Sequence, residues 1–167
     1  MSALDPDHLR TRLLDALVAP GARQRTERSR IVQAARRRFV AGDGIDDAVA
    51  TAAWLRRTNR LAALHPLLPA ATDAAAVEAT ISEATTAIER VAPVTAGGDY
   101  HSELYLAPEH LGLGQDPARA EEALRRVCTV GDEHRVDVTL RSGPDHAMDT
   151  LLDLVQRVRL DHPRLTT

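Results

Sequence analysis

The stretch Arg-Val-Asp-Val-Thr-Leu-Arg, residues 135–141, decides the fold class, because apolar and polar residues alternate along it without interruption. Val136, Val138 and Leu140 fall on one side of an extended chain, and the polar residues fall on the other. A period of two is typical of a half-buried β-strand. Tyr100–Leu106 repeats the pattern more weakly and is predicted as a second strand. Because helical segments surround both strands, the sequence predicts a mostly helical α+β fold.

Helices are expected on both sides of the 135–141 strand. Asp116-Pro117 opens one helix, since an acidic cap followed by proline is typical of a helix start. Pro144-Asp145 opens the last one, with proline at the first helical position and an acid in the first turn. Residues 100–167 therefore form a small β-α-β-α unit. Two strands alone make a marginal sheet. Either a third strand at Val127–Val130 pairs back across a turn at Gly131–His134, or a partner chain completes the sheet, which gives two or three strands.

The clearest helix upstream begins near Asp73 and is stopped by Pro93. Its apolar residues recur at steps of four and three, which places them on one face of a helix. They are Val77, Ile81, Ala84, Ile88 and Val91.

Three further helices are expected before it, at about residues 5–19, 24–41 and 46–64, separated by Pro20-Gly21 and Gly42-Asp43-Gly44. The sequence thus predicts an Arg-rich four-helix bundle over residues 1–92. A linker at 93–99 follows, and the unit at 100–167 docks on the bundle. The alternative is that the whole chain forms one domain.

Composition excludes several chemistries. All 21 basic side chains are Arg, so the chain cannot form a lysine Schiff base or a P-loop. A single cysteine, Cys128, excludes an internal disulfide and a cysteine-clustered zinc site. The start of the sequence lacks the pattern of a secretion signal, and no apolar run approaches membrane-spanning length. We expect a cytoplasmic protein without a cofactor, and the abundance of residues with GC-rich codons indicates a bacterial source.

Charge is distributed unevenly along the chain. The net charge is +5 over residues 1–70 and −8 over 71–167, for a total of −3. Clustered arginines on helices are typical of phosphate binding, but they also serve as ordinary solvated surface. The arginines that would contact nucleic acid are Arg23, Arg28, Arg30, Arg36, Arg37, Arg38, Arg56, Arg57 and Arg60.

Part of this basic region resembles the opening helices of TetR-type repressors. The resemblance covers about 25 residues: Arg30 to Phe39, then Gly42 or Gly44, then Ile45 to Ala53. It would imply a DNA-binding helix-turn-helix. The sequence departs from the family at Trp54–Arg60, where the family's turn has a glycine, and the chain is not assigned to it.

One group of side chains has the composition of a metal site. His101 and Glu103 share a face of the predicted strand, and Glu109 and His110 follow just beyond it. Imidazoles and carboxylates in this number could hold zinc or iron(II) with an open position. The alternative is a solvent-facing strand edge.

Three functions follow, in order of preference. The first is a non-catalytic binding or assembly protein that acts through helix faces and a sheet edge, with a protein partner or a second copy. The second is a nucleic-acid-binding regulator that uses the Arg-rich helices at 22–41 and 46–64. The third is a small metal-dependent enzyme centred on His101, Glu103 and His110. No membrane partner is expected, and the sequence favours a protein that is not an enzyme.

Overall fold

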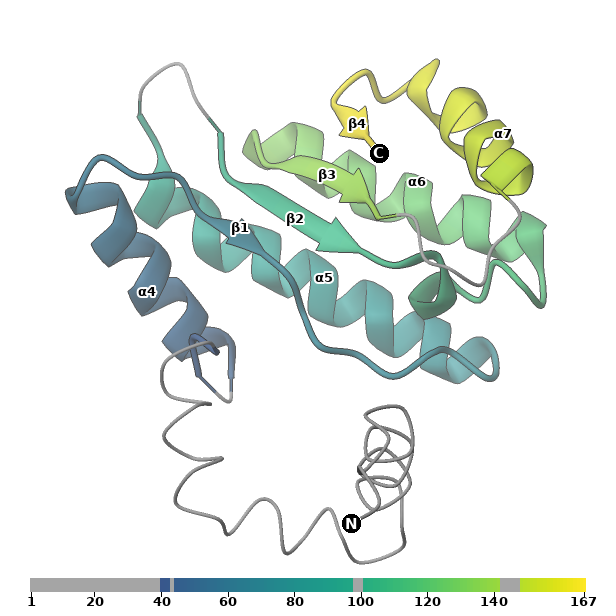
Figure 1. The fold of residues 1–167 in the computed structure, drawn as a ribbon, viewed down its shortest axis with the longest axis horizontal. Helices are drawn as coiled ribbons and strands as arrows, with labels where there is room; N and C mark the ends of the chain where they lie inside the picture. Colours follow the sequence, from purple (N-terminus) through teal and green to yellow (C-terminus); the bar gives the residue numbers. More distant parts are fainter. Residues whose placement is uncertain (1–39, 43, 98–100, 142–147) are drawn as a thin grey trace, which may run out of the picture. The chain divides into compact units, whose positions relative to one another are not determined.

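The computed structural model describes residues 40–42, 44–97, 101–141 and 148–167. Residues Gly44–Thr167 form one compact unit, whose fold is shown in Figure 1. Its elements in chain order are α4 (Ile45–Arg57), β1 (Ala63–Leu64), α5 (Ala74–Thr95), β2 (Glu103–Leu106), the 3-10 helix η1 (Pro108–Leu111), α6 (Pro117–His134), β3 (Asp137–Leu140), α7 (Met148–Arg159) and β4 (Leu165–Thr166).

The sheet has four parallel strands in the order β1-β2-β3-β4, which is also their order in the chain. Each strand therefore pairs with the next one along the sequence, and a helix connects each pair. Figure 1 shows the strands in front, with α5 and α6 behind them and α7 beside β4. This confirms the predicted combination of helices with a small sheet, although the sheet has four strands instead of two or three.

The long helix α5 forms where the apolar spacing predicts it. Its N-terminal cap is Asp73, whose carboxylate accepts a hydrogen bond from the Ala76 N–H at 2.8 Å. The five apolar residues that define its predicted face are all buried. The helix continues two residues past Pro93, to Thr95. Helix α5 connects β1 to β2, so it packs against the sheet as part of the same fold.

Helix α6 begins at the predicted cap, where Asp116 accepts from the Arg119 N–H at 3.1 Å. It then runs unbroken to His134 and ends at Arg135 in a left-handed conformation, with φ of 58°. The predicted third strand at Val127–Val130 and the turn at Gly131–His134 are therefore wrong. Both segments are helical, and β3 pairs in parallel with β2 and β4 instead of forming a hairpin.

The core lies between the sheet and these helices. Leu104, Leu106, Val138, Leu140 and Leu165 point from three strands into one apolar cluster. Their helical partners are Val77, Ile81, Ile88 and Val91 of α5, Ala120, Leu124 and Val127 of α6, and Leu151, Leu154, Val155 and Val158 of α7. The predicted start of the last helix at Pro144-Asp145 falls outside the described residues.

The structure does not support the four-helix bundle predicted for residues 1–92. The two helices expected at 5–19 and 24–41 lie outside the described residues, apart from residues 40 and 41. The third ends at Arg57 instead of Leu64, and the last two residues of the predicted helix, Ala63–Leu64, form β1. The fourth is α5. The described helices thus pack against a sheet, and the segment proposed as a linker begins inside α5.

Helix α4 is continuous through Trp54–Arg57, the stretch where the sequence departs from TetR-type repressors. Its N-terminal end is held against α5 by an ion pair between Asp46 and Arg90. Near its C-terminal end, Arg56 donates to the carbonyl of Gly97, which follows α5. None of the described helices is long and apolar enough to span a membrane.

Candidate functional site

The face of the sheet turned away from the helices is polar. Residues between the buried leucines and valines must point to the other side, because side chains alternate along a strand. No helix of the described residues crosses this face in Figure 1. We call it the polar face; it carries Ala63, His101, Glu103, Tyr105, Asp137, Thr139, Arg164 and Thr166.

Thr139 lies at the centre of the polar face and connects three strands. Its hydroxyl donates to the Glu103 carboxylate on β2 and lies 2.6 Å from the Thr166 hydroxyl on β4. The Glu103 carboxylate also raises the pKa of the neighbouring Tyr105 phenol, mainly by charge repulsion. Polar residues from β2, β3 and β4 therefore form one connected surface.

A second group lies where the strands begin. The Arg164 guanidinium, just before β4, is 3.2 Å from the Asp137 carboxylate of β3 and 3.2 Å from Nε2 of His101. Since a guanidinium can only donate hydrogen bonds, the His101 nitrogen is the acceptor in this contact. The ionisable groups at this end of the polar face are thus paired with one another.

The opposite end of the sheet is where the strands finish. His65 follows β1, and its ring lies 6.3 Å from the Tyr105 ring. His110 in η1 follows β2, is buried, and accepts from the Ala107 N–H at 3.4 Å. Burial lowers the pKa of His110, as do nearby His65 and Arg141, while Glu109 acts in the opposite direction. Ligands of parallel sheets commonly bind at this edge.

The structure separates the four predicted metal ligands into two pairs. His101 and Glu103 belong to the start of β2, where Arg164 and Thr139 contact them. Glu109 and His110 lie beyond its end, in η1. Among the described residues, no group of three or more His, Cys, Asp or Glu side chains is placed to hold a metal ion. Metal binding therefore stays a prediction.

The predicted nucleic-acid residues are mostly beyond the described part of the chain. Arg23, Arg28, Arg30, Arg36, Arg37 and Arg38 lie there. Of the other three, Arg56 donates to the Gly97 carbonyl, whereas Arg57 and Arg60 are exposed at and just after the end of α4. None of these three forms an ion pair with an acidic residue of the described chain. Nucleic-acid binding also stays a prediction.

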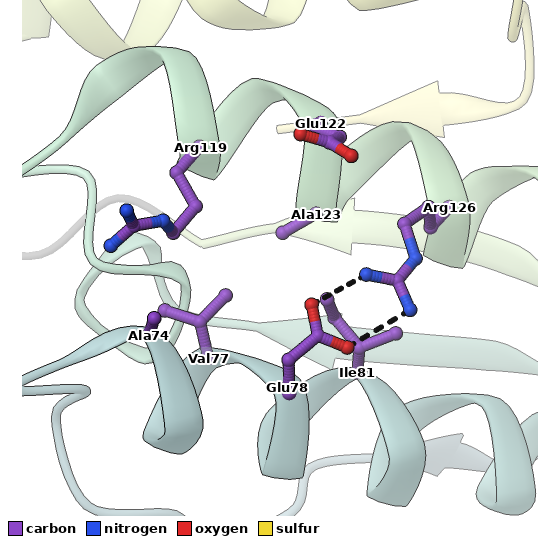
Figure 2. Close-up of a pocket in the computed structure, with 8 residues that line it drawn as sticks. All are labelled: Ala74, Val77, Glu78, Ile81, Arg119, Glu122, Ala123 and Arg126. Carbon is purple, nitrogen blue, oxygen red and sulfur yellow. Dashed lines mark hydrogen bonds and ion pairs between the residues drawn. The ribbon is translucent and has the colours of Figure 1, made fainter.

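Arginines of the acidic half mostly pair within that half. Arg126 of α6 makes two bonds to Glu78 of α5, at 2.6 and 3.0 Å, and lowers the pKa of that carboxyl (Figure 2). Glu121 of α6 accepts from Arg157 of α7 and from Arg125, which lower its pKa. These contacts fasten the helical layer together.

The shallow pocket in Figure 2 lies between α5 and α6, away from the sheet. Its charged lining includes Arg126 and Glu78, which are bonded to each other, and Arg119, whose guanidinium is 3.4 Å from Asp116. Its other lining residues are Ala74, Val77, Ile81, Glu122 and Ala123. Because most of its charges are neutralised locally, we regard the polar face as the stronger candidate site.

Sequence reasoning found part of the polar face and missed the rest. Asp137 and Thr139 could be assigned to one side of the strand from the alternation in 135–141. Arg164 and Thr166 could not, because β4 is two residues long and has no alternating pattern. Comparison with protein-family models and with curated proteins finds no match for the chain.

Proposed function

We propose that the chain is a non-catalytic binding or assembly protein that acts through the polar face and the two open edges of its sheet. The observation that carries this proposal is that, within the described part of the chain, helices pack on only one face of the sheet. Parallel sheets occur almost always with both faces covered. Here α5, α6 and α7 contribute to a core on one face, and the opposite face carries Glu103, Thr139 and their neighbours.

The sheet edges support the same proposal. Strands β1 and β4 are the outer strands of the described sheet, and each is two residues long. The outer side of an edge strand presents backbone N–H and C=O groups that can pair with another chain. Together with the polar face, these edges make a surface suited to docking.

Pairing among the charged groups favours binding over catalysis. Asp137 is paired with Arg164, and Glu103 accepts from Thr139. A general base has to lie within hydrogen-bond reach of the proton that it abstracts. Both of these carboxylates already bond to side chains of neighbouring strands. This arrangement is better suited to orienting a partner than to transferring a proton.

Cysteine labelling tests whether the polar face is covered in the cell. In a Cys128→Ala background, Tyr105→Cys places a thiol on the polar face, and Ala79→Cys places one on the exposed side of α5. We expect Tyr105→Cys to be protected from a thiol reagent in cells that natively produce the protein, and to become reactive after purification and dilution. Ala79→Cys should react equally in both. Full reaction of Tyr105→Cys in the cell would refute the proposal.

A further inference from the structure

We propose that the partner of the polar face is a second copy of this chain, and that two copies join their sheets into one closed barrel of eight parallel strands. This inference rests on the proposed function and names its partner. Each copy would contribute half of the barrel wall and half of its polar interior.

Strand order is the first argument. Every strand pairs in parallel with the next one in the sequence, and the connecting helices lie on one side (Figure 1). This is the arrangement found along the wall of a β/α barrel, which closes with eight strands. A four-stranded piece is half of that number. If β4 of one copy lies beside β1 of the other, all strands stay parallel and their order continues without a break.

Symmetry allows this contact to close. A contact between two different surfaces, such as the β4 edge and the β1 edge, forms either a ring or an open filament. Two copies related by a twofold axis along the barrel make two identical β4–β1 contacts. Both pairs of open edges are then used, and no edge is left to recruit a third copy.

The exposed apolar side chains provide an independent argument. Six large apolar residues of the described chain are well exposed, and all six lie on segments that flank the two edge strands. None lies on α5 or α6, the helices in the middle. On the β1 side they are Trp54, Leu61 and Leu67, which are 49%, 54% and 78% exposed, and on the β4 side they are Met148, Leu152 and Leu160, which are 52%, 41% and 84% exposed.

Closure would bring these two apolar groups together. Helix α4 precedes β1 and helix α7 precedes β4. When β4 pairs with β1 of the second copy, α7 of the first copy becomes the neighbour of α4 of the second. Leu152 and Trp54 would then face each other across the junction. Burying apolar surface is the main driving force of most protein association. The exposed apolar residues lie on the segments that the proposed junction between β4 and β1 would bury.

Engineered disulfides test the junction directly. Ala63 and Thr166 are exposed residues on the two outer strands. Within one chain they are three strand spacings apart, roughly 14 Å, because neighbouring strands lie about 4.8 Å apart. A disulfide needs Cα atoms closer than about 7 Å. An Ala63→Cys/Thr166→Cys chain, also carrying Cys128→Ala, can therefore bridge these positions only to another copy.

We expect mild oxidation to convert this double variant into covalent dimers, while each single variant stays largely uncrosslinked because equivalent strands lie across the barrel. Crosslinking of either single variant as efficiently as the double one would indicate a face-to-face dimer and overturn the proposal. Covalent ladders longer than dimers would indicate an open filament and would overturn it as well.

Solution mass provides the second test, on the full chain. We expect the unmodified chain to sediment at twice the mass of one chain. Leu152→Glu and Trp54→Glu should each sediment as monomers, and their mixture should recover dimers, since one of its two junctions contains no substitution. The control Ala79→Glu, on the exposed side of α5, should remain dimeric.

A monomeric unmodified chain, or a mixture that does not recover dimers, would overturn barrel closure. If Tyr105→Cys is nevertheless protected in the cell, the polar face binds a different partner, and the proposed function stands without this inference. If Tyr105→Cys is unprotected as well, both fail.

Discussion

Gly131 of α6 and Val136, directly before β3, approach so closely that a Cβ atom on the glycine would lie 2.9 Å from the Val136 carbonyl oxygen. The Val136 N–H also donates to the Gly131 carbonyl at 2.9 Å, so this hydrogen bond holds the backbones of the two residues at a short distance. The same Cβ would lie 3.0 Å from Cγ2 of Val138. Helix α6 can therefore pack this closely against β3 because residue 131 has no side chain.

We expect Gly131→Ala to destabilise the fold by about 1–3 kcal/mol, the usual cost of overpacking a core. Urea unfolding would measure the free energy of unfolding. Alanine in place of glycine normally stabilises a helix by about 1 kcal/mol, so the sign of the change separates the two effects. Thr129→Ala, at an exposed position on the same helix, is the control and should change stability little. A Gly131→Ala chain as stable as the unmodified one would contradict the close approach.

Gly131 also shows where prediction from sequence fails. A glycine followed by Asp, Glu and His predicts a turn, and this turn made a hairpin one of the two expected ways to complete the sheet. In the structure this residue is a glycine because α6 packs closely against β3 there. That contact joins two elements of the fold, so the local sequence pattern cannot reveal it. By contrast, α5 and β3 were predicted correctly because their apolar spacing is regular and they bury one complete face.

The two edge strands escaped prediction for a different reason. Ala63–Leu64 and Leu165–Thr166 are too short to show a period of two, and β1 follows a helix whose pattern continued past its real end. Their identity depends on pairing with β2 and β3. Part of the polar face could therefore be assigned in advance, from the predicted strands at 100–106 and 135–141, while its connection to Arg164 and Thr166 needed the sheet.

The ion pair between Arg164 and Asp137 should help to hold β4 against β3. We expect Arg164→Gln to lower the free energy of unfolding by about 0.5–1 kcal/mol, the range of a partly exposed pair. The difference from the unmodified chain should shrink at high salt, because salt screens the attraction. Urea unfolding at two salt concentrations measures both, with Arg159→Gln on the exposed side of α7 as control. A difference independent of salt would argue against an electrostatic role for the pair.

Cys128 should behave as a buried core residue instead of a nucleophile. Burial raises the pKa of its thiol to about 12, with nearby Asp132 acting in the same direction. Because the thiolate is the reactive form, Ellman's reagent should modify the folded chain slowly at pH 8 and the urea-unfolded chain rapidly. Rapid modification of the folded chain would show that the thiol is accessible.

The same thiol predicts a loss of stability at high pH. The folded chain keeps the thiol proton that the unfolded chain releases near pH 9. The contribution of this thiol to the free energy of unfolding is therefore complete below pH 9 and is lost as pH rises toward 12. Cys128→Ala removes this titration. Its stability relative to the unmodified chain should therefore improve between pH 9 and 11, which denaturant unfolding at several pH values would detect.

His110 should make the fold sensitive to acid. Burial lowers its pKa below the ordinary value of 6.5, with Glu109 opposing the effect and His65 and Arg141 adding to it. As pH falls, the imidazole of residue 110 takes up a proton in the unfolded chain before it does so in the folded chain. The free energy of unfolding is therefore unaffected by this group above pH 6.5 and decreases as pH drops below that value. His110→Gln should be less sensitive to pH in this range, whereas His134→Gln, exposed at the end of α6, should respond like the unmodified chain. Equal pH profiles for all three would remove His110 as the cause.

The nucleic-acid alternative makes a prediction of its own. If the Arg-rich helices bind phosphates, the full chain should bind duplex DNA with an affinity that falls steeply as salt rises. An Arg36→Ala/Arg57→Ala chain should bind more weakly, and the slope of log affinity against log salt should fall by about 1 for each phosphate contact removed. Arg119→Ala is a suitable control, since Arg119 pairs with Asp116 in the acidic half. Binding that is absent at low salt, or that the double substitution leaves unchanged, would rule this alternative out and leave the polar face and open edges of the sheet as the candidate surface.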